Sequence, residues 1–305
     1  MDGIFRNSIL TTRFRCQYNA NQYEFPGMDQ KPIKDKNPSI PSLVKINRRI
    51  GIGLLAVLGL LPASPAFALR PYLATQSAVP IDTGKSRLEL GVTDNRINTH
   101  LDQIVLLGGL TYGVINNLDF EVDFPYVFLQ NDKAPDEDGL GDLKLRTKIR
   151  FIKGREANPL SMAGEVVVKI PSCDDNKNLH DAECTGEPDV EITGIASKEF
   201  FPVTVHLNIG YIFVGGQNSN DKNLDNVFRY SLGFDFQSVY DAVRFVAELA
   251  GENNRNPDAT SDLLSLLGGV IFVIDPSKSI DFAIAKGITQ ETSDYTFTLG
   301  FSALF

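Results

Sequence analysis

Two stretches of the sequence carry opposite charges at every second position. The acidic residues are Asp119, Glu121 and Asp123, and the basic ones are Lys144, Arg146, Lys148 and Arg150. Carboxylates and cations at this spacing could pair across two adjacent strands. Lining a narrow water-filled pore, they could also create a field that orients and sorts small polar or charged solutes. A purely structural role, in which charges fill and rigidify a barrel interior, is equally open.

The elements that must position these charges are β-strands, because successive side chains of a strand point to opposite faces. In LDFEVDFPYVFL (118–129) one face begins with three acids and the other is apolar. Such segments recur at about the length of a tilted membrane strand, roughly 9–11 residues. The expected strands are 84–95, 101–113, 118–129, 140–152, 161–170, 188–199, 203–214, 227–237, 243–252, 263–274, 280–288 and 294–305.

We therefore expect an all-β fold, a transmembrane antiparallel β-barrel of about twelve strands over residues 84–305. Its polar faces would line the interior, and acidic and basic residues of consecutive strands would be neighbours. The residues expected to line the pore are Asp119, Glu121, Asp123, Lys144, Arg146, Lys148, Arg150, Glu165, Lys169, Glu191, Arg229, Asp235, Arg244 and Glu248.

The N-terminal part has the pattern of an export signal. Basic residues precede the apolar run IGIGLLAVLGLL (50–61), and a small-x-small site ends at Ala68. This predicts a signal peptide over 44–68 with cleavage after Ala68. Residues 1–43 are then a disordered extension or the result of a mis-assigned start, and 69–83 form a periplasmic lead-in.

Three features favour lipid over a protein core as the environment of the apolar faces. The first is the signal peptide, and the second is the alternation of short turns with long polar loops, which is typical of outer-membrane barrels. The third is the ending YTFTLGFSALF, which resembles the C-terminal strand that the bacterial barrel assembly machinery reads. The residues of this expected assembly signal are Tyr295, Phe297, Leu299, Phe301 and Phe305.

Charge and cysteine content limit the partners. Residues 1–68 hold 9 of the 29 Lys and Arg and 4 of the 38 Asp and Glu residues, which leaves the rest with a net charge of −14. This acidity argues against nucleic acid as a partner. Cys173 and Cys184 lie in one loop of an exported chain and are expected to form a disulfide. The acidic loops lack the spacing of known calcium motifs, so we expect no metal.

A family resemblance rests on GLGDLKLRTKIRFI (139–152), which follows the acidic strand ending in FPYVFL. A G-x-G-D turn entering a strand with alternating basic residues resembles the outer-membrane transporter family of the phenol-degradation meta-pathway. The resemblance covers roughly residues 84–305. It implies a barrel that admits small, often hydrophobic compounds, and it brings no catalytic residues.

The function that these observations favour is passive transport of small molecules, hydrophobic or aromatic ones included, by a monomeric barrel in the bacterial outer membrane. A structural or adhesive barrel with a closed lumen, acting through its loops, is the alternative. A lipid-modifying enzyme is third, but the alternation around His206 points this side chain into the lumen, away from lipid. We expect no cofactor. The expected partners are outer-membrane lipid, the barrel assembly machinery and small-molecule solutes.

Overall fold

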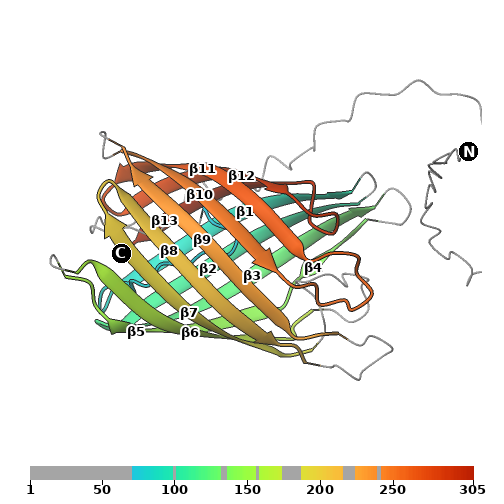
Figure 1. Ribbon diagram of the computed structural model, residues 1–305, viewed down its shortest axis with the longest axis horizontal. Coiled ribbons are helices and arrows are strands. Elements are labelled where there is room, and N and C mark those ends of the chain that lie inside the picture. The colour runs from blue at the N-terminus through green and yellow to red at the C-terminus, as the bar shows by residue number, and fades with distance from the viewer. Residues whose placement is uncertain are drawn as a thin grey trace, which may run out of the picture. The chain divides into compact units, whose positions relative to one another are not determined.

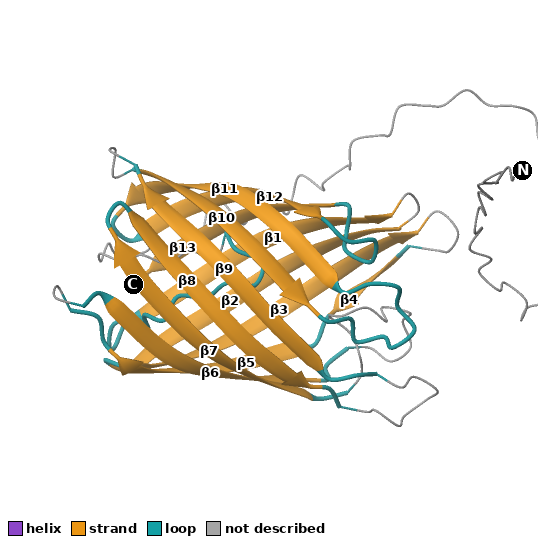
Figure 2. Ribbon diagram, viewed as in Figure 1, coloured by secondary structure: helices purple, strands orange, loops and turns teal. Residues whose placement is uncertain are grey.

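The computed structural model describes residues 71–98, 101–131, 136–155, 158–173, 187–215, 224–238 and 242–305. These residues form strands joined by turns and loops (Figures 1 and 2). The strands are β1 (Ser86–Asn98), β2 (Leu101–Ile115), β3 (Leu118–Asn131), β4 (Glu137–Leu140), β5 (Leu143–Ile152), β6 (Leu160–Ile170), β7 (Asp189–Phe200), β8 (Val203–Phe213), β9 (Val227–Gln237), β10 (Val243–Glu252), β11 (Leu263–Asp275), β12 (Lys278–Gly287) and β13 (Tyr295–Leu304).

The strands close into one antiparallel barrel. Each strand pairs with the next along the chain, except that β3 pairs with both β4 and β5, and β1 also pairs with β13, from Arg87 opposite Leu304 to Arg96 opposite Tyr295. Since β4 and β5 both pair with β3, the thirteen described segments make twelve barrel strands. This confirms the fold class and strand number expected from the sequence.

The break between β4 and β5 lies opposite a proline. Pro125 of β3 has no N–H to donate, and the partner strand is interrupted beside it at Gly141 and Asp142. Gly141 instead donates its own N–H to the Pro125 carbonyl at 2.9 Å. The sequence predicted one unbroken strand here, because the alternation of side chains does not report a bulge.

Apolar side chains point outward and polar ones inward. On β3, Phe120 and Phe124 are 38% and 53% exposed, whereas Asp119 and Asp123 are 3% and 1% exposed. The same division holds around the barrel, so the large exposed residues are mostly aromatic or aliphatic and the buried ones are often charged. This is the arrangement of a barrel that faces hydrocarbon and encloses a polar interior.

No helix in the part of the chain that the structure describes is long and apolar enough to cross a membrane.

The register of β3 and β5 brings the two charged rows together. Asp123 lies opposite Lys144, Glu121 opposite Arg146, and Asp119 opposite Lys148. The expected neighbourhood of the acidic and the basic strand is therefore present, and the structure adds its register.

Residues 71–83 form no strand and enter β1 through a turn at Gly84, whose φ is +78°. A segment without regular structure is visible inside the ring of strands (Figures 1 and 2). Gly84 donates its N–H to the carbonyl of Gly113 on β2 at 2.8 Å, which fixes the start of the first strand. The segment comprises the described part of the expected lead-in, and its contacts lie on the inner wall, as shown below.

Candidate functional site in the barrel interior

The interior of the barrel is organised first by Arg146 of β5. Its guanidinium lies 2.7 Å from the Asp123 carboxylate of β3 and 3.3 Å from that of Glu165 on β6. One cation therefore joins two carboxylates on the strands at either side. Lys148, one inward position further along β5, lies 3.7 Å from Asp119.

Further ion pairs continue around the same wall. Lys169 of β6 lies 2.8 Å from Asp189 of β7 and 3.3 Å from Asp142 in the break between β4 and β5. Arg229 of β9 lies 3.2 Å from Glu191 of β7. These contacts cross-link the inner faces of strands that are not all adjacent, because the long side chains reach over the small residues between them.

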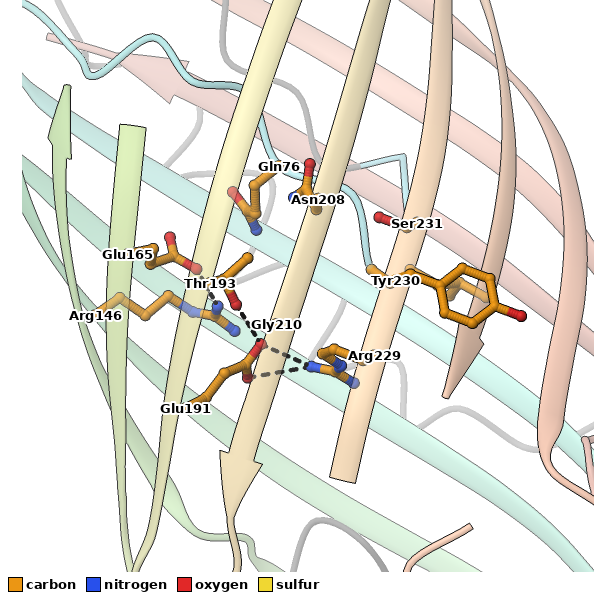
Figure 3. Close-up of a pocket in the computed structure, with 12 residues that line it drawn as sticks. Gln76, Arg146, Glu165, Glu191, Thr193, Asn208, Gly210, Arg229, Tyr230 and Ser231 are labelled. Carbon is orange, nitrogen blue, oxygen red and sulfur yellow. Dashed lines mark hydrogen bonds and ion pairs between the residues drawn. The ribbon is translucent and has the colours of Figure 1, made fainter. Parts of the chain in front are cut away.

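Arg229 also pairs with Glu252 of β10 at 2.7 Å. Its bridge to Glu191 spans β8 at Gly210, where an added Cβ would lie 2.6 Å from the Thr193 hydroxyl and 3.1 Å from Arg229 itself. Figure 3 shows the side chains of Glu191, Thr193 and Arg229 pointing toward one another. They line a cavity of about 50 Å³. A glycine at this position is thus a requirement of the network.

All fourteen predicted lumen residues are on described strands, and most belong to this network. Arg244 pairs with Asp235, with one contact of 2.9 Å between Nε and Oδ1. Glu248 is 1% exposed. Arg150 lies apart from the others, near a turn, where it donates to the carbonyl of Asn116 at 2.9 Å. Their role in lining a pore stays a prediction.

The segment 71–83 is held by Glu248. Its carboxylate accepts the backbone N–H groups of Leu73, Ala74 and Thr75 at 2.8, 2.9 and 2.6 Å. The Thr75 hydroxyl donates to Ser231 of β9 at 2.8 Å. Three donors converging on one carboxylate form a charge-assisted attachment, which is stronger than neutral hydrogen bonds.

The segment continues across the inner wall toward β3. Ala78 donates its N–H to the Ser197 hydroxyl at 2.9 Å, and Ile81 donates its N–H to Asp119 at 3.1 Å. Since Glu248, Ser197 and Asp119 lie on β10, β7 and β3, the segment spans much of the interior. It therefore occupies part of the cross-section of the barrel.

His206 is placed inside, as its alternation predicted. It is 6% exposed, its Nδ1 lies 2.8 Å from the Ser197 hydroxyl, and Tyr72 contacts it edge-on at 6.2 Å between ring centroids. The Ser197 hydroxyl also accepts the Ala78 N–H. This Ser–His pair is covered by the segment and faces away from the outer surface.

A larger cavity of about 500 Å³ lies between the segment and the strands around the β1–β13 seam. Its wall combines charged, amide and apolar side chains, among them Glu89, Asp281, Arg146, Gln103, Leu107 and Tyr72. This volume falls within the range of small-molecule sites, about 300–1,000 Å³. Among the described residues, no group of three or more His, Cys, Asp or Glu side chains is placed to hold a metal ion.

The sequence of residues 70–305 matches the family described as "Putative MetA-pathway of phenol degradation". The chain belongs to this family. The match spans the segment and all the strands, so it confirms the resemblance drawn from residues 139–152 and extends it to the N-terminal segment.

Solved structures place this family member among outer-membrane barrels. An outer-membrane channel from Pseudomonas putida F1 aligns with a TM-score of 0.62 at 12% identity, over 77% of this chain and 100% of that chain. The NanC porin gives 0.49 at 11% identity over 72% and 98%, and the CymD monoaromatic hydrocarbon channel gives 0.42 at 11% over 73% and 88%. The first of these structures supports the barrel fold of this chain. No curated protein sequence matches the chain significantly.

Sequence reasoning missed several interior residues of this family member. Arg87, Glu89 and Asp281 are buried on inward positions of β1 and β12, and Asp142 and Asp189 complete the site of Lys169. The alternation that predicts an inward position was present for Asp281, since DFAIA (281–285) alternates a polar or small residue with a large one. It was hidden because alanines and glycines on the inner face weaken the polar periodicity.

Other predicted sites are only partly within the described residues. Ala68 and Cys184 lie outside them, while Cys173 is disulfide-bonded. The pairing of Cys173 with Cys184 and the cleavage site stay predictions. The expected assembly residues Tyr295, Phe297 and Leu299 are 44%, 37% and 54% exposed on the outer face of β13.

Proposed function

We propose that the protein is an outer-membrane channel through which small molecules pass passively. The observation that carries this proposal is the cavity of about 500 Å³ inside a closed barrel. Its wall offers hydrogen-bonding and apolar groups side by side, which suits transient contact with small solutes. The segment 71–83 narrows the path, so the solutes are small.

The solute class that we propose is small aromatic or apolar compounds. Val105, Leu107 and Pro125 contribute apolar surface to the cavity. A buried apolar cluster lies inside β10–β12 under Tyr72, which itself lines the cavity, and is made of Val246, Leu267, Ile271, Ala283 and Ala285. The apolar part of the cavity wall is not needed for the passage of ions, and the description of the family, phenol degradation, points the same way.

The outer surface fits lipid as its partner. Exposed aromatic and aliphatic residues cover the outward positions of the described strands, and a closed barrel leaves no backbone edge in the hydrocarbon. We propose that the barrel assembly machinery reads the outward row of β13. We also propose that the barrel is a monomer.

The two other functions are testable on the same molecule. A barrel that acts through its loops would fold normally and pass nothing. An enzyme would need a reactive group that meets its substrate, but the Ser197–His206 pair is buried under Ala78. We propose no enzymatic activity, and His206→Gln is expected to leave phospholipid hydrolysis at the background of empty vesicles.

The test of the channel is conductance in planar bilayers together with swelling of liposomes in phenol-sized neutral solutes. Gly91→Leu is the informative variant, because the nearest atoms to its added Cβ are 3.9 Å away while Gly91 lines the cavity. The matched control is Gly268→Leu, where the added Cβ meets nothing within 4 Å. We expect Gly91→Leu to reduce permeation and Gly268→Leu to leave it unchanged. Heat-modifiable wild-type protein that passes neither ions nor solutes would refute the channel.

A further inference from the structure

Asp281 is a carboxylate in the wall of the large cavity that has one buried oxygen without a hydrogen bond from the described residues. It lies on an inward position of β12 and is 3% exposed. Within the described part of the chain, its Oδ1 is buried and has no hydrogen-bond partner. Buried polar atoms almost always have one, so an orphaned carboxylate oxygen needs an explanation.

The neighbouring strands leave room beside this carboxylate. Asp281 pairs with Gly300 on β13, and Gly300 pairs in turn with Gly91 on β1. An added Cβ on Gly300 would lie 2.4 Å from Asp281 Oδ2, so the carboxylate lies over the glycine. The absence of side chains at two consecutive inward positions is what opens the cavity here.

The surroundings carry more negative than positive charge. Glu89 lines the same cavity, one inward position before Gly91 on β1. Its cation, Arg87, lies 3.3 Å from Glu89 and 3.9 Å from Glu121, so one positive charge serves two carboxylates. Arg146 and Lys144 are the cations of the cavity wall, against the carboxylates of Glu89, Asp123, Asp281 and Glu291. Arg146 is held by Asp123 and Glu165 at 2.7 and 3.3 Å.

A buried carboxylate next to another carboxylate is stabilised either by a proton or by a cation. The roomy, partly polar cavity favours a cation, because a mobile positive charge can reach both groups. We propose that Asp281 and Glu89 form a cation-binding subsite, which takes a small monovalent positive charge such as K⁺ or the ammonium group of a small amine. Two carboxylates without a third acidic ligand do not suit a divalent metal.

The subsite gives the proposed channel a preference for positive charge. It rests on the proposed function only because cations would reach the subsite through the channel. Cation over anion selectivity would be set on the β1–β13 side, whereas the opposite wall is neutralised by its own ion pairs.

The first test is the reversal potential of the full protein in a KCl gradient. Asp281→Asn keeps the shape and removes the charge, and we expect it to lower the K⁺/Cl⁻ permeability ratio by about fivefold, as one charge interaction near a wet wall supports.

The matched control is Asp258→Asn, which removes a carboxylate from an exposed loop position outside the cavity and is expected to leave the ratio unchanged. An Asp281→Asn ratio equal to the wild type would overturn the proposal. Wild-type channels without cation preference would overturn it too, while leaving the channel function intact.

The second test does not need an open path. Butylammonium binding to the wild-type protein in detergent is measured by calorimetry against 1-butanol, which has the same tail and no charge. We expect heat of binding for butylammonium only, reduced by added KCl if both cations share the subsite. Binding unaffected by KCl would assign the site to the ammonium group alone. No binding, or equal binding of 1-butanol, would overturn the proposal even if Asp281→Asn failed to fold.

Discussion

The Glu248 carboxylate accepts the backbone N–H of Thr75 at 2.6 Å, although 173 residues separate the two in the sequence. The same carboxylate holds the two preceding N–H groups of the segment 71–83. The position of a segment without regular structure is thereby set by one buried side chain of β10. Its attachment can be weakened without touching any ladder hydrogen bond of the barrel.

Replacing Glu248 by Gln is expected to loosen the segment. An amide nitrogen cannot accept an N–H, so at least one of the three bonds is lost, and hydrogen bonds to a charged group contribute about 1.5–3 kcal/mol each. Deuterium exchange at Leu73–Thr75 should accelerate, and bilayer currents should become larger and noisier. Glu199→Gln, at an exposed position of β7, is the control. Unchanged exchange in Glu248→Gln would show that other contacts hold the segment.

Replacing Arg146 by Gln is expected to destabilise the barrel. The change leaves Asp123 and Glu165 buried without their shared cation, and breaking a buried pair costs about 3–5 kcal/mol. Arg150→Gln on the same strand should cost less than about 1 kcal/mol, because Arg150 is near a turn and bonds a backbone carbonyl. Urea unfolding in lipid vesicles, followed by gel mobility, measures both. Equal losses for the two variants would contradict a structural role for the network.

Gly300→Ala is expected to destabilise the barrel and shift Asp281. The added methyl group would lie 2.4–2.7 Å from the atoms of the Asp281 carboxyl group, and overpacking of this kind typically costs about 1–3 kcal/mol. Gly268→Ala should be nearly neutral because its Cβ meets no atom within 4 Å. The readout is again urea unfolding. A neutral Gly300→Ala would mean that the Asp281 side chain can move aside at little cost.

Leu299→Arg tests the environment of the outer face. Leu299 is 54% exposed near the middle of β13, so lipid contact predicts a cost of about 2–4 kcal/mol. Ile274→Arg, at the end of β11, should cost about 0–1 kcal/mol, because arginine reaches water near the interface. Folding yield into vesicles and urea midpoints measure the difference. Equal costs at both positions would argue against a lipid-facing surface.

Much of the fold was accessible from the alternation of side chains. The period of two places Asp119, Glu121 and Asp123 on one face, and a single loop between two strands makes them antiparallel neighbours. That acids and bases lie side by side on the inner face follows from these two facts, whereas the register that places Asp123 opposite Lys144 came from the structure. Pattern alone could not reveal the interruption beside Pro125, since a bulge changes the count of residues without changing their character.

The segment 71–83 and the Asp281 subsite were inaccessible for a different reason. Neither has a local signature, because each depends on distant residues. The sequence predicted that Glu248 faces the lumen. Its hydrogen bonds to the segment 71–83 could be recognised only in the closed barrel, which brings the two together. Asp281 gains its importance from Gly300 and Gly91, two empty positions on the next two strands.

The seam between β1 and β13 has a consequence for biogenesis. Thr296 donates to Asn95 at 2.9 Å across 201 residues of chain, and the whole β1–β13 ladder has comparable separations. Such distant pairing is entropically slow, and no partial product of synthesis can complete it. Until it forms, β1 and β13 both present unpaired backbone edges that invite aggregation. The cylinder is therefore sealed only after the last strand has been made, and its two edges stay open until then.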